Sequence, residues 1–380
     1  MLDSLLNKIT EEFPNYRASV VKNILLLSLC MLHQESICLH KISKVVGLFL
    51  GNHQSKHSAH VKRFYRLLSV YAFSRLWLDL LYYAFSLLRL ESKYLVLDGT
   101  SWFARSKGTH YHHYLTLSVV YQGVAIPILW IDLRKQGLSN QKQRIMLLKK
   151  AKKRFQLEGK ILLADREYIG KHWFKFLIEN KIDFVIRVRS KNYKEEVSAA
   201  SGKSYDRLVN KVLNSKKPSK VVGKIFEMEG MTLQLVIAKN PHPEAKDHLV
   251  YLITNLLEHP IKVASKYPIR WQIEMCFKHL KSNGFDLEKM NVEGYARQQL
   301  LMAIMIFAYT ISLIEGLKNY KKVPRKKYRN GKCYKVISVF RKGLAEVTRV
   351  CWNFEAFCQY LIQNNQQAKN KYRSLKTIIV

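Results

Sequence analysis

Residues 94–189 carry a succession of patterns that few folds accommodate. Three apolar segments come first, and they are rich in β-branched and aromatic residues, as strands are; they cover residues 94–100, 111–123 and 124–133. A helical pattern follows, for which we expect Ser139 to be the N-cap, and after it come a strand, a second helix and another strand. The sequence therefore predicts an antiparallel meander followed by helical crossovers, in the order β-β-β-α-β-α-β.

That order predicts an α/β fold. It matches a ribonuclease-H-like core, in which parallel strands reached through helical crossovers extend a meander, although other mixed α/β folds share the order. From about residue 190 to residue 255 the sequence is first polar and lysine-rich, and then alternates as strands around a Glu-Gly turn. We therefore expect a β-rich insertion there, followed by two long helices at about 261–282 and 294–319.

Changes of pattern divide the chain into three predicted domains. Residues 1–90 contain apolar clusters with helical spacing, separated by polar and basic stretches, which indicates a helical N-terminal domain. Residues 91–320 hold the predicted α/β core with its insertion. Residues 321–380 begin with a very basic run and then return to a helical pattern, which predicts a basic helical C-terminal region.

The charge balance indicates a polyanionic partner. The 380 residues include 64 Lys and Arg against 28 Asp and Glu, which gives a formal net charge of +36. Nucleic acid fits such a surface best, because each neutralised phosphate releases condensed counterions. An anionic membrane is the alternative, but the basic residues are spread over the whole chain rather than gathered on one amphipathic helix. We therefore expect nucleic acid as the partner and no membrane.

Several features predict a cytoplasmic protein. The N-terminus mixes charges of both signs and lacks the continuous apolar stretch of a signal peptide. The apolar run at residues 300–314 is shorter than the roughly 20 residues that span a bilayer, so we expect a buried core helix. The six cysteines show no C-x-x-C pair and no zinc-finger spacing, which favours a reducing compartment and roles in packing.

Two aspartates stand where a sheet can present them to a substrate. Asp98 ends the apolar segment of "YLVLDGT" and Asp165 ends that of "ILLADRE", and side chains at strand ends emerge into the cleft at the edge of a sheet. Phosphodiester cleavage and strand transfer need an activated water or 3′-hydroxyl and a stabilised leaving oxygen. Two Mg²⁺ ions about 4 Å apart supply both when carboxylates hold them. We therefore expect the two aspartates to share metal ions.

A third carboxylate lies in the helical segment "YPIRWQIEMCFKHLK". At about 100° per residue, five polar positions of this helix fall within an arc of roughly 80°; they are Tyr267, Arg270, Glu274, Lys278 and Lys281. On such a face the glutamate can hold a metal ion while the cations grip the phosphates beside the cut. The alternative is an ordinary surface helix with i,i+4 charge pairs. The two strand-end aspartates favour the catalytic interpretation.

The same segment resembles a signature of bacterial DDE transposases of the insertion-sequence-four group. That signature is Tyr-x2-Arg-x3-Glu-x6-Lys, and its four positions are matched by Tyr267, Arg270, Glu274 and Lys281. The segment "LLADREYIG" is similar to the second motif of the group and "LVLDGTSW" to its first, so the resemblance covers about residues 94–320.

The resemblance implies a ribonuclease-H-like catalytic domain that is interrupted by a β-strand insertion. It implies that Asp98, Asp165 and Glu274 are catalytic and hold two Mg²⁺ ions, for which Mn²⁺ can substitute. It also implies that Arg166 and Glu167 lie close to the metals. Three residues of the signature are implied to contact DNA phosphates near the transferred end; they are Tyr267, Arg270 and Lys281.

A course of reaction is implied as well. A homodimer acts on the terminal inverted repeats of a mobile element in a bacterial cytoplasm, associated with the nucleoid when bound to DNA, and the N-terminal helical domain reads the DNA ends. The enzyme nicks the DNA to free a 3′-hydroxyl, which attacks the opposite strand and forms a hairpin. The hairpin is reopened, and the 3′ ends are joined to target DNA. Base flipping beside the cut accompanies the hairpin step.

One departure from the resemblance concerns the flipped base. Relatives place a tryptophan in the β insertion to stack on that base, whereas this insertion has none; its candidates for the role are Phe226, Met228 and Tyr205. Two other functions stay open. The chain could be a ribonuclease-H-fold nuclease without strand transfer, or a catalytically silent DNA-binding protein derived from a transposase.

Overall fold

The chain forms two compact units. The computed structural model describes residues 1–52, 54–88, 91–103, 111–202, 204–240, 247–318, 320–327, 331 and 333–371. The unit that we call the sheet unit comprises Glu91–Ser101 and His113–Met275. The other, the helical unit, comprises Met1–Leu90, Trp102–His112 and Cys276–Ile379. The predicted domains 1–90, 91–320 and 321–380 stay a prediction.

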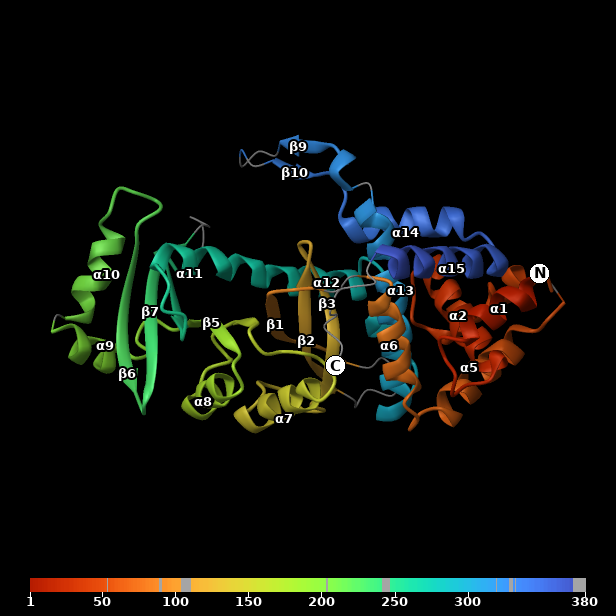
Figure 1. The fold of residues 1–380 in the computed structure, drawn as a ribbon, viewed down its shortest axis with the longest axis horizontal. Coiled ribbons are helices and arrows are strands. Elements are labelled where there is room, and N and C mark those ends of the chain that lie inside the picture. Colours follow the sequence, from red (N-terminus) through yellow and green to blue (C-terminus); the bar gives the residue numbers. More distant parts are fainter. Residues whose placement is uncertain are drawn as a thin grey trace. The chain divides into compact units, whose positions relative to one another are not determined.

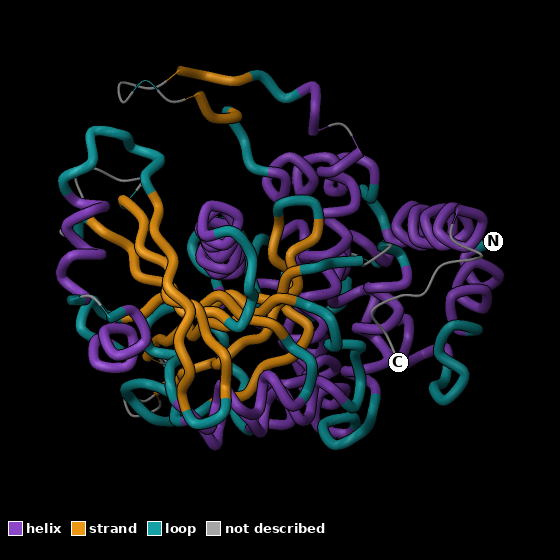
Figure 2. The backbone as a smooth tube through the Cα atoms, turned by 60° about the vertical axis from the view of Figure 1, so that its left-hand side comes forward, coloured by secondary structure: helices purple, strands orange, loops and turns teal. Residues whose placement is uncertain are grey.

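Within the described residues, the sheet unit is built on one mixed sheet of eight strands, in the order β3-β2-β1-β4-β5-β8-β7-β6 (Figure 1). The strands are β1 (Tyr94–Phe103), β2 (Tyr111–Tyr121), β3 (Val124–Asp132), β4 (Ile161–Ala164), β5 (Asp183–Val188), β6 (Val221–Met228), β7 (Met231–Lys239) and β8 (Leu249–Thr254). β4 pairs in parallel with both β1 and β5, whereas β2–β3, β5–β8, β8–β7 and β7–β6 are antiparallel. Figure 2 shows the strands as a twisted layer, as the handedness of strands requires.

The order of elements from β1 to β5 is the predicted one. Helix α7 (Gln141–Lys152) connects β3 to β4 and packs on β3, and helix α8 (Lys171–Glu179) connects β4 to β5 and packs on β5. All four residues of β4 are buried, as expected for a central parallel strand whose two faces are both covered. The N-cap of α7 differs from the prediction. It is Asn140 rather than Ser139, and Asn140 forms a capping box with Gln143.

The insertion contains helices that the sequence did not predict. Helices α9 (Lys194–Ser201) and α10 (Tyr205–Leu213) occupy its first half, the polar and lysine-rich part that precedes the predicted strands. In α10 the side chains of Tyr205 and Val212 are buried, so one face of this short helix is anchored although most of its residues are polar. The predicted hairpin is present: β6 and β7 are joined by a two-residue turn at Glu229 and Gly230, and both φ angles are positive, as a type I′ turn requires.

The first of the two predicted long helices is interrupted. It consists of helix α11 (Pro260–Lys266), the 3₁₀ turn η1 (Tyr267–Arg270) and helix α12 (Trp271–Leu280). Pro268 lies inside the turn and has no N–H to donate to the carbonyl four residues earlier. The α-helical ladder is therefore broken there, and short 3₁₀ turns are frequent where α-helices end or begin, so the proline accounts for the interruption.

The helical unit is assembled from helices at both ends of the chain. The N-terminal helices are α1 (Leu2–Thr10), α2 (Ala18–Gln34), α3 (Leu39–Ser43), α4 (Val46–Leu50), α5 (His57–Val70) and α6 (Leu76–Ser86). The later elements are η2 (Leu287–Lys289), α13 (Tyr295–Lys318), η3 (Tyr320–Lys322), β9 (Arg325–Lys327), β10 (Cys333–Lys335), α14 (Val339–Val350) and α15 (Phe354–Lys371). Helix α15 packs on α1, and β9 and β10 form a small antiparallel hairpin.

Helix α13 is the core of the helical unit. It packs against α2, α6 and α14. It has 24 residues and is apolar enough to cross a membrane by length and composition, but 89% of its most apolar window is buried inside the protein. The helix is therefore longer than the predicted apolar run at residues 300–314. It is buried, as predicted for a core helix.

A buried histidine gives the helical unit a pH dependence. The ring of His279, at the end of α12, lies 4.8 Å from the ring of Phe340 and 6.2 Å from that of Tyr309. Burial is the largest cause that lowers the pKa of His279 from its ordinary value of 6.5 to about 4, and the charges of Lys278 and Arg341 contribute to the same shift. The folded protein therefore keeps this imidazole neutral at pH values where the unfolded chain protonates it.

We expect the free energy of unfolding to fall as the pH drops from about 6.5 to about 4, by up to roughly 3 kcal/mol from this group. Above pH 6.5 both states are neutral, and below pH 4 both are protonated, so the loss is confined to that window. Urea denaturation across this window measures it. In His279→Phe the contribution disappears, and the variant should lose less stability on acidification than the wild type. Parallel pH profiles of the two proteins would contradict the prediction.

Candidate active site

The sheet brings the two predicted aspartates next to each other. In the parallel pairing of β1 with β4, the last paired residues are Leu97 and Ala164. Asp98 and Asp165 are the residues that follow on each chain segment. Parallel strands in register end at the same edge of the sheet, so both carboxylates emerge there side by side.

Both aspartates are fixed by the backbone that follows them. Asp98 Oδ1 accepts a hydrogen bond from Gly99 N at 2.8 Å, and Asp165 Oδ1 accepts one from Arg166 N at 2.7 Å. Their side chains are 19% and 30% exposed, so each keeps an oxygen that a ligand can reach. These bonds orient the second carboxylate oxygen of each aspartate away from its own backbone.

Arg270 joins the three predicted catalytic carboxylates. Its Nη1 lies 3.2 Å from Asp98 Oδ2, and its Nη2 lies 4.0 Å from Asp165 Oδ2. The same Nη2 donates a hydrogen bond to Glu274 Oε1. The Arg270 side chain is only 10% exposed. Three carboxylates from β1, the end of β4 and α12 therefore converge on one cation.

The 3₁₀ turn explains how Tyr267 joins this group. Residues three apart eclipse one another in a 3₁₀ helix, and Tyr267 and Arg270 are the first and last residues of η1. The guanidinium carbon of Arg270 lies 5.8 Å from the centre of the Tyr267 ring, and the Tyr267 hydroxyl lies 3.3 Å from Asp165 Oδ1. One turn later, Glu274 follows Arg270 at the i,i+4 spacing of an α-helix. The predicted shared face is present for these three residues.

Burial and neighbouring charges shift the pKa values of the site. The pKa of Asp98 is raised from 3.8 to about 6, mainly by burial; Arg270 and the N–H of Gly99 oppose the shift, and the charges of Glu167 and Glu274 add to it. Burial lowers the pKa of Arg270, but the nearby Tyr267 and the three carboxylates raise it more, so its net shift is upward. The charges of Arg270 and Asp98 are therefore coupled: Arg270 lowers the pKa of Asp98, and Asp98 raises that of Arg270.

This chemistry fits a divalent metal ion. Carboxylate oxygens are the ligands that Mg²⁺ prefers, and three of them already share one cation. Among the described residues, no three or more His, Cys, Asp and Glu side chains are grouped as a ready metal site. The guanidinium of Arg270 contacts the carboxylates of Asp98, Asp165 and Glu274. These three side chains are the donors that suit a metal ion.

Arg144, which the sequence analysis missed, supports the segment after Asp165. This buried side chain of α7 donates to Ser139 Oγ at 2.9 Å and to the carbonyl of Ile169 at 3.1 Å. Its guanidinium carbon lies 5.1 Å from the centre of the Tyr168 ring. An arginine with several partners inside a protein holds its neighbours in one geometry, so Arg144 fixes residues three and four positions beyond Asp165. No sequence motif marks it, because its partners are a serine hydroxyl, backbone carbonyls and an aromatic ring.

Arg166, Lys278 and Lys281 are other residues predicted to lie near the metals or to contact DNA. The guanidinium of Arg166 is directed to Asp247, at 3.5 Å. Lys278 is exposed and Lys281 is half-buried, and both belong to the part of α12 and its C-terminal end that lies in the helical unit. Lys281 pairs there with Glu288 at 3.2 Å, and its Nζ lies 5.6 Å from the centre of the Trp102 ring.

The three candidates for stacking on a flipped base are buried. Phe226 is 2% exposed, Met228 5% and Tyr205 3%, and the Tyr205 hydroxyl donates to the carbonyl of Ser190. A side chain that packs inside the insertion cannot also present its face to a base. Hydrophobic packing of the insertion is therefore the role that the structure gives them.

Comparison with known proteins identifies the family. A family model described as the transposase DDE domain matches residues 90–311, which is more than half of the chain. The protein belongs to this family and is a DDE transposase, an enzyme of DNA transposition. Enzymes of this family generally use divalent metal ions, in agreement with the donors at the site.

Similarity to individual proteins is weaker than the match to the family. A solved structure, the synaptic complex of piggyBac transposase with hairpin DNA, is similar with a TM-score of 0.45 and 12% sequence identity, over 95% of this chain and 74% of that one. No curated protein sequence matches.

Proposed function

We propose that this transposase cleaves DNA at the terminal inverted repeats of a mobile element and joins the 3′ ends to target DNA, with Asp98, Asp165 and Glu274 as its catalytic residues. The observation that carries the proposal is the convergence of these three carboxylates on a single cation. The strand order β3-β2-β1-β4-β5, with β4 parallel to both neighbours, supports a ribonuclease-H-like core.

The proposed cofactor is a pair of Mg²⁺ ions held by the three carboxylates, with Mn²⁺ able to substitute. When bound, the ions would activate the attacking water or 3′-hydroxyl and stabilise the leaving oxygen. The protein's own part is to position the carboxylates at the sheet edge and to provide Arg270 and Tyr267 for the phosphates beside the cut. Arg270 can do so because a guanidinium pairs with phosphate through two parallel hydrogen bonds.

The resemblance of "YPIRWQIEMCFKHLK" to the insertion-sequence-four signature supports finer assignments. We propose a cut-and-paste reaction through a hairpin, carried out by a homodimer in a bacterial cytoplasm. The helices of residues 1–90 are proposed to read the DNA ends, and Lys278 and Lys281 to contact DNA. A nuclease without strand transfer and a catalytically silent DNA-binding protein, the two other functions that the sequence leaves open, are outcomes of the test.

One experiment separates these functions. Purified protein is incubated with Mg²⁺ and a labelled duplex that carries the terminal repeat of the element, and a denaturing gel resolves nicks, hairpins and joined products. Nicked and joined products are expected, and a hairpin band supports the cut-and-paste course. Nicks without joining would identify a nuclease, and binding without any cut would contradict the catalytic assignment.

A further inference from the structure

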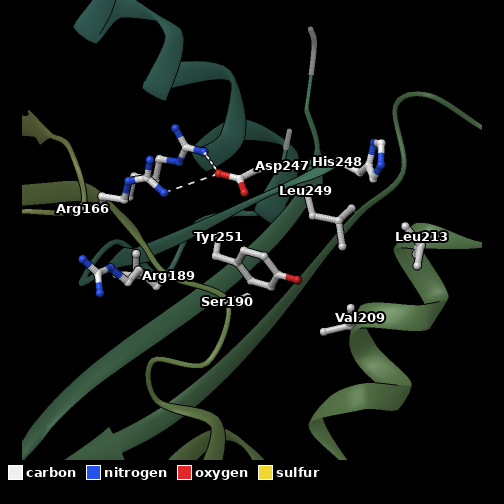
Figure 3. A pocket seen from close by; sticks show the side chains of 11 residues that line it. Arg166, Arg189, Ser190, Val209, Leu213, Asp247, His248, Leu249 and Tyr251 are labelled. Carbon is white, nitrogen blue, oxygen red and sulfur yellow. Dashed lines mark hydrogen bonds and ion pairs between the residues drawn. The ribbon is translucent and has the colours of Figure 1, made fainter. Parts of the chain in front are cut away.

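A second cationic site lies beside the carboxylates. A pocket of about 320 Å³ in the sheet unit is lined by Arg166, Arg187, Arg189, Asp247, His248 and Tyr251, among others. We call it the arginine pocket (Figure 3). Arg166 directly follows the catalytic candidate Asp165, so the pocket begins one residue from the proposed site of cleavage.

The sheet explains why three arginines meet there. Arg166 follows the end of β4, and Arg187 lies on the neighbouring parallel strand β5. Arg189 is the first residue after β5, and its side chain also lines the pocket. The antiparallel strand β8 places Tyr251 opposite Val188, and α10 adds the aliphatic side chains of Val209 and Leu213 (Figure 3).

Asp247 forms ion pairs with two of the arginines of the pocket. Its Oδ2 lies 2.9 Å from Arg187 Nη2 and 3.5 Å from Arg166 Nη1, so one carboxylate oxygen bridges two guanidinium groups (Figure 3). The Asp247 side chain is 52% exposed, and ion pairs at such exposure are weak and easily exchanged. Among the residues that the structure describes, no carboxylate forms an ion pair with Arg189. Three arginines against one aspartate leave the pocket with an excess of positive charge.

We propose that the arginine pocket binds a phosphodiester group of the DNA strand, and that Asp247 occupies the place of this phosphate until DNA arrives. A phosphate offers more acceptor oxygens than a carboxylate and pairs with guanidinium groups in the same two-pronged geometry. The inference rests on the proposed function, because it takes DNA as the ligand.

Substitutions of Arg187 and of Asp247 are expected to have opposite effects on DNA binding. Arg187→Gln removes the central guanidinium and should weaken binding by roughly tenfold, with the slope of log Kd against log salt reduced by about one. Asp247→Asn removes the internal competitor and should tighten binding by roughly threefold or more, since the exchanged ion pairs are weak. Because the second variant gains affinity, misfolding cannot imitate its result.

Matched controls separate the pocket from general charge effects. Arg154→Gln removes an arginine at the end of α7 in the same unit, and Glu229→Gln removes a 55% exposed carboxylate that is paired with Lys171 at 2.8 Å. Fluorescence anisotropy measures the binding of labelled duplex and single-stranded oligonucleotides in EDTA, so that no cleavage intervenes. Effects on both oligonucleotides indicate a phosphate of the duplex backbone, and effects on the single strand alone indicate an unpaired strand.

The outcomes distinguish the two proposals. If each pocket variant merely matches its control while the wild type binds and cuts DNA, the pocket proposal is wrong and the proposed function stands. If the wild type does not bind DNA at all, both proposals are wrong. Inorganic phosphate at the ionic strength of the chloride buffer tests the free anion: if it reverses the effect of Asp247→Asn at concentrations that leave the controls unchanged, the pocket prefers free phosphate to DNA.

Discussion

Replacing Glu274 by Gln is expected to reduce DNA cleavage and strand transfer by about 10³-fold or more while DNA binding is kept. The glutamine keeps the shape of the side chain but removes the charge that completes the proposed metal site. Metal-ion catalysis contributes several kcal/mol to a phosphoryl transfer, and about 1.4 kcal/mol corresponds to a tenfold change in rate. The substitution adds one unit of positive charge to the protein, so electrostatics gives no reason for weaker binding to DNA.

The measurement combines a cleavage gel in Mg²⁺ with a binding assay in EDTA. Glu258→Gln is the matched control, because it makes the same change in the same unit at a carboxylate that pairs with Lys266. The control should cut at the rate of the wild type. Cleavage by Glu274→Gln at a comparable rate would remove Glu274 from the catalytic residues, and loss of DNA binding would show that the variant fails before chemistry.

The pairing of Asp98 with Asp165 could be predicted from sequence because it depends on local signals. Each aspartate ends a short apolar strand, and the order of strands and helices makes those strands parallel neighbours. The interruption of the first long helix could also be predicted, since Pro268 lies in its middle. The spacing of the apolar residues favours one continuous helix, because this spacing continues through the proline.

The contacts of the charged groups could not be predicted in the same way. The sequence places Arg270 on the face of Glu274, where we expect it to grip phosphates, but its contact with Asp98 joins positions 172 residues apart. The i,i+4 pair of Arg270 with Glu274, which the alternative interpretation predicts, is present as well. The arginine pocket was missed for the same reason. "VIRVRS" shows two arginines on one face of a strand, but nothing in the sequence marks Asp247 as their partner.

The position of Arg270 predicts a link between metal ions and stability. In Arg270→Gln, the carboxylates of Asp98, Asp165 and Glu274 lose the cation that they share. Removing one partner from a buried ion pair leaves uncompensated charge and costs about 3 kcal/mol or more. We therefore expect the variant to unfold several degrees below the wild type in EDTA, since about 1 kcal/mol shifts the midpoint by roughly 2–4 °C in large domains.

Divalent metal ions should restore much of this loss. A metal that binds the folded protein alone stabilises it in proportion to the logarithm of its concentration over Kd, and the variant offers the carboxylates without a competing guanidinium. The wild type should gain less from Mg²⁺ or Mn²⁺ in the absence of DNA, because each ion must first displace Arg270. Thermal unfolding of both proteins in EDTA, in Mg²⁺ and in KCl of equal ionic strength measures the difference and separates binding from screening.

Equal gains in the two proteins would show that Arg270 does not compete with the metal. If so, the guanidinium could stay in place during catalysis, whereas a larger gain in the variant means that DNA phosphates must draw Arg270 away before the site is complete.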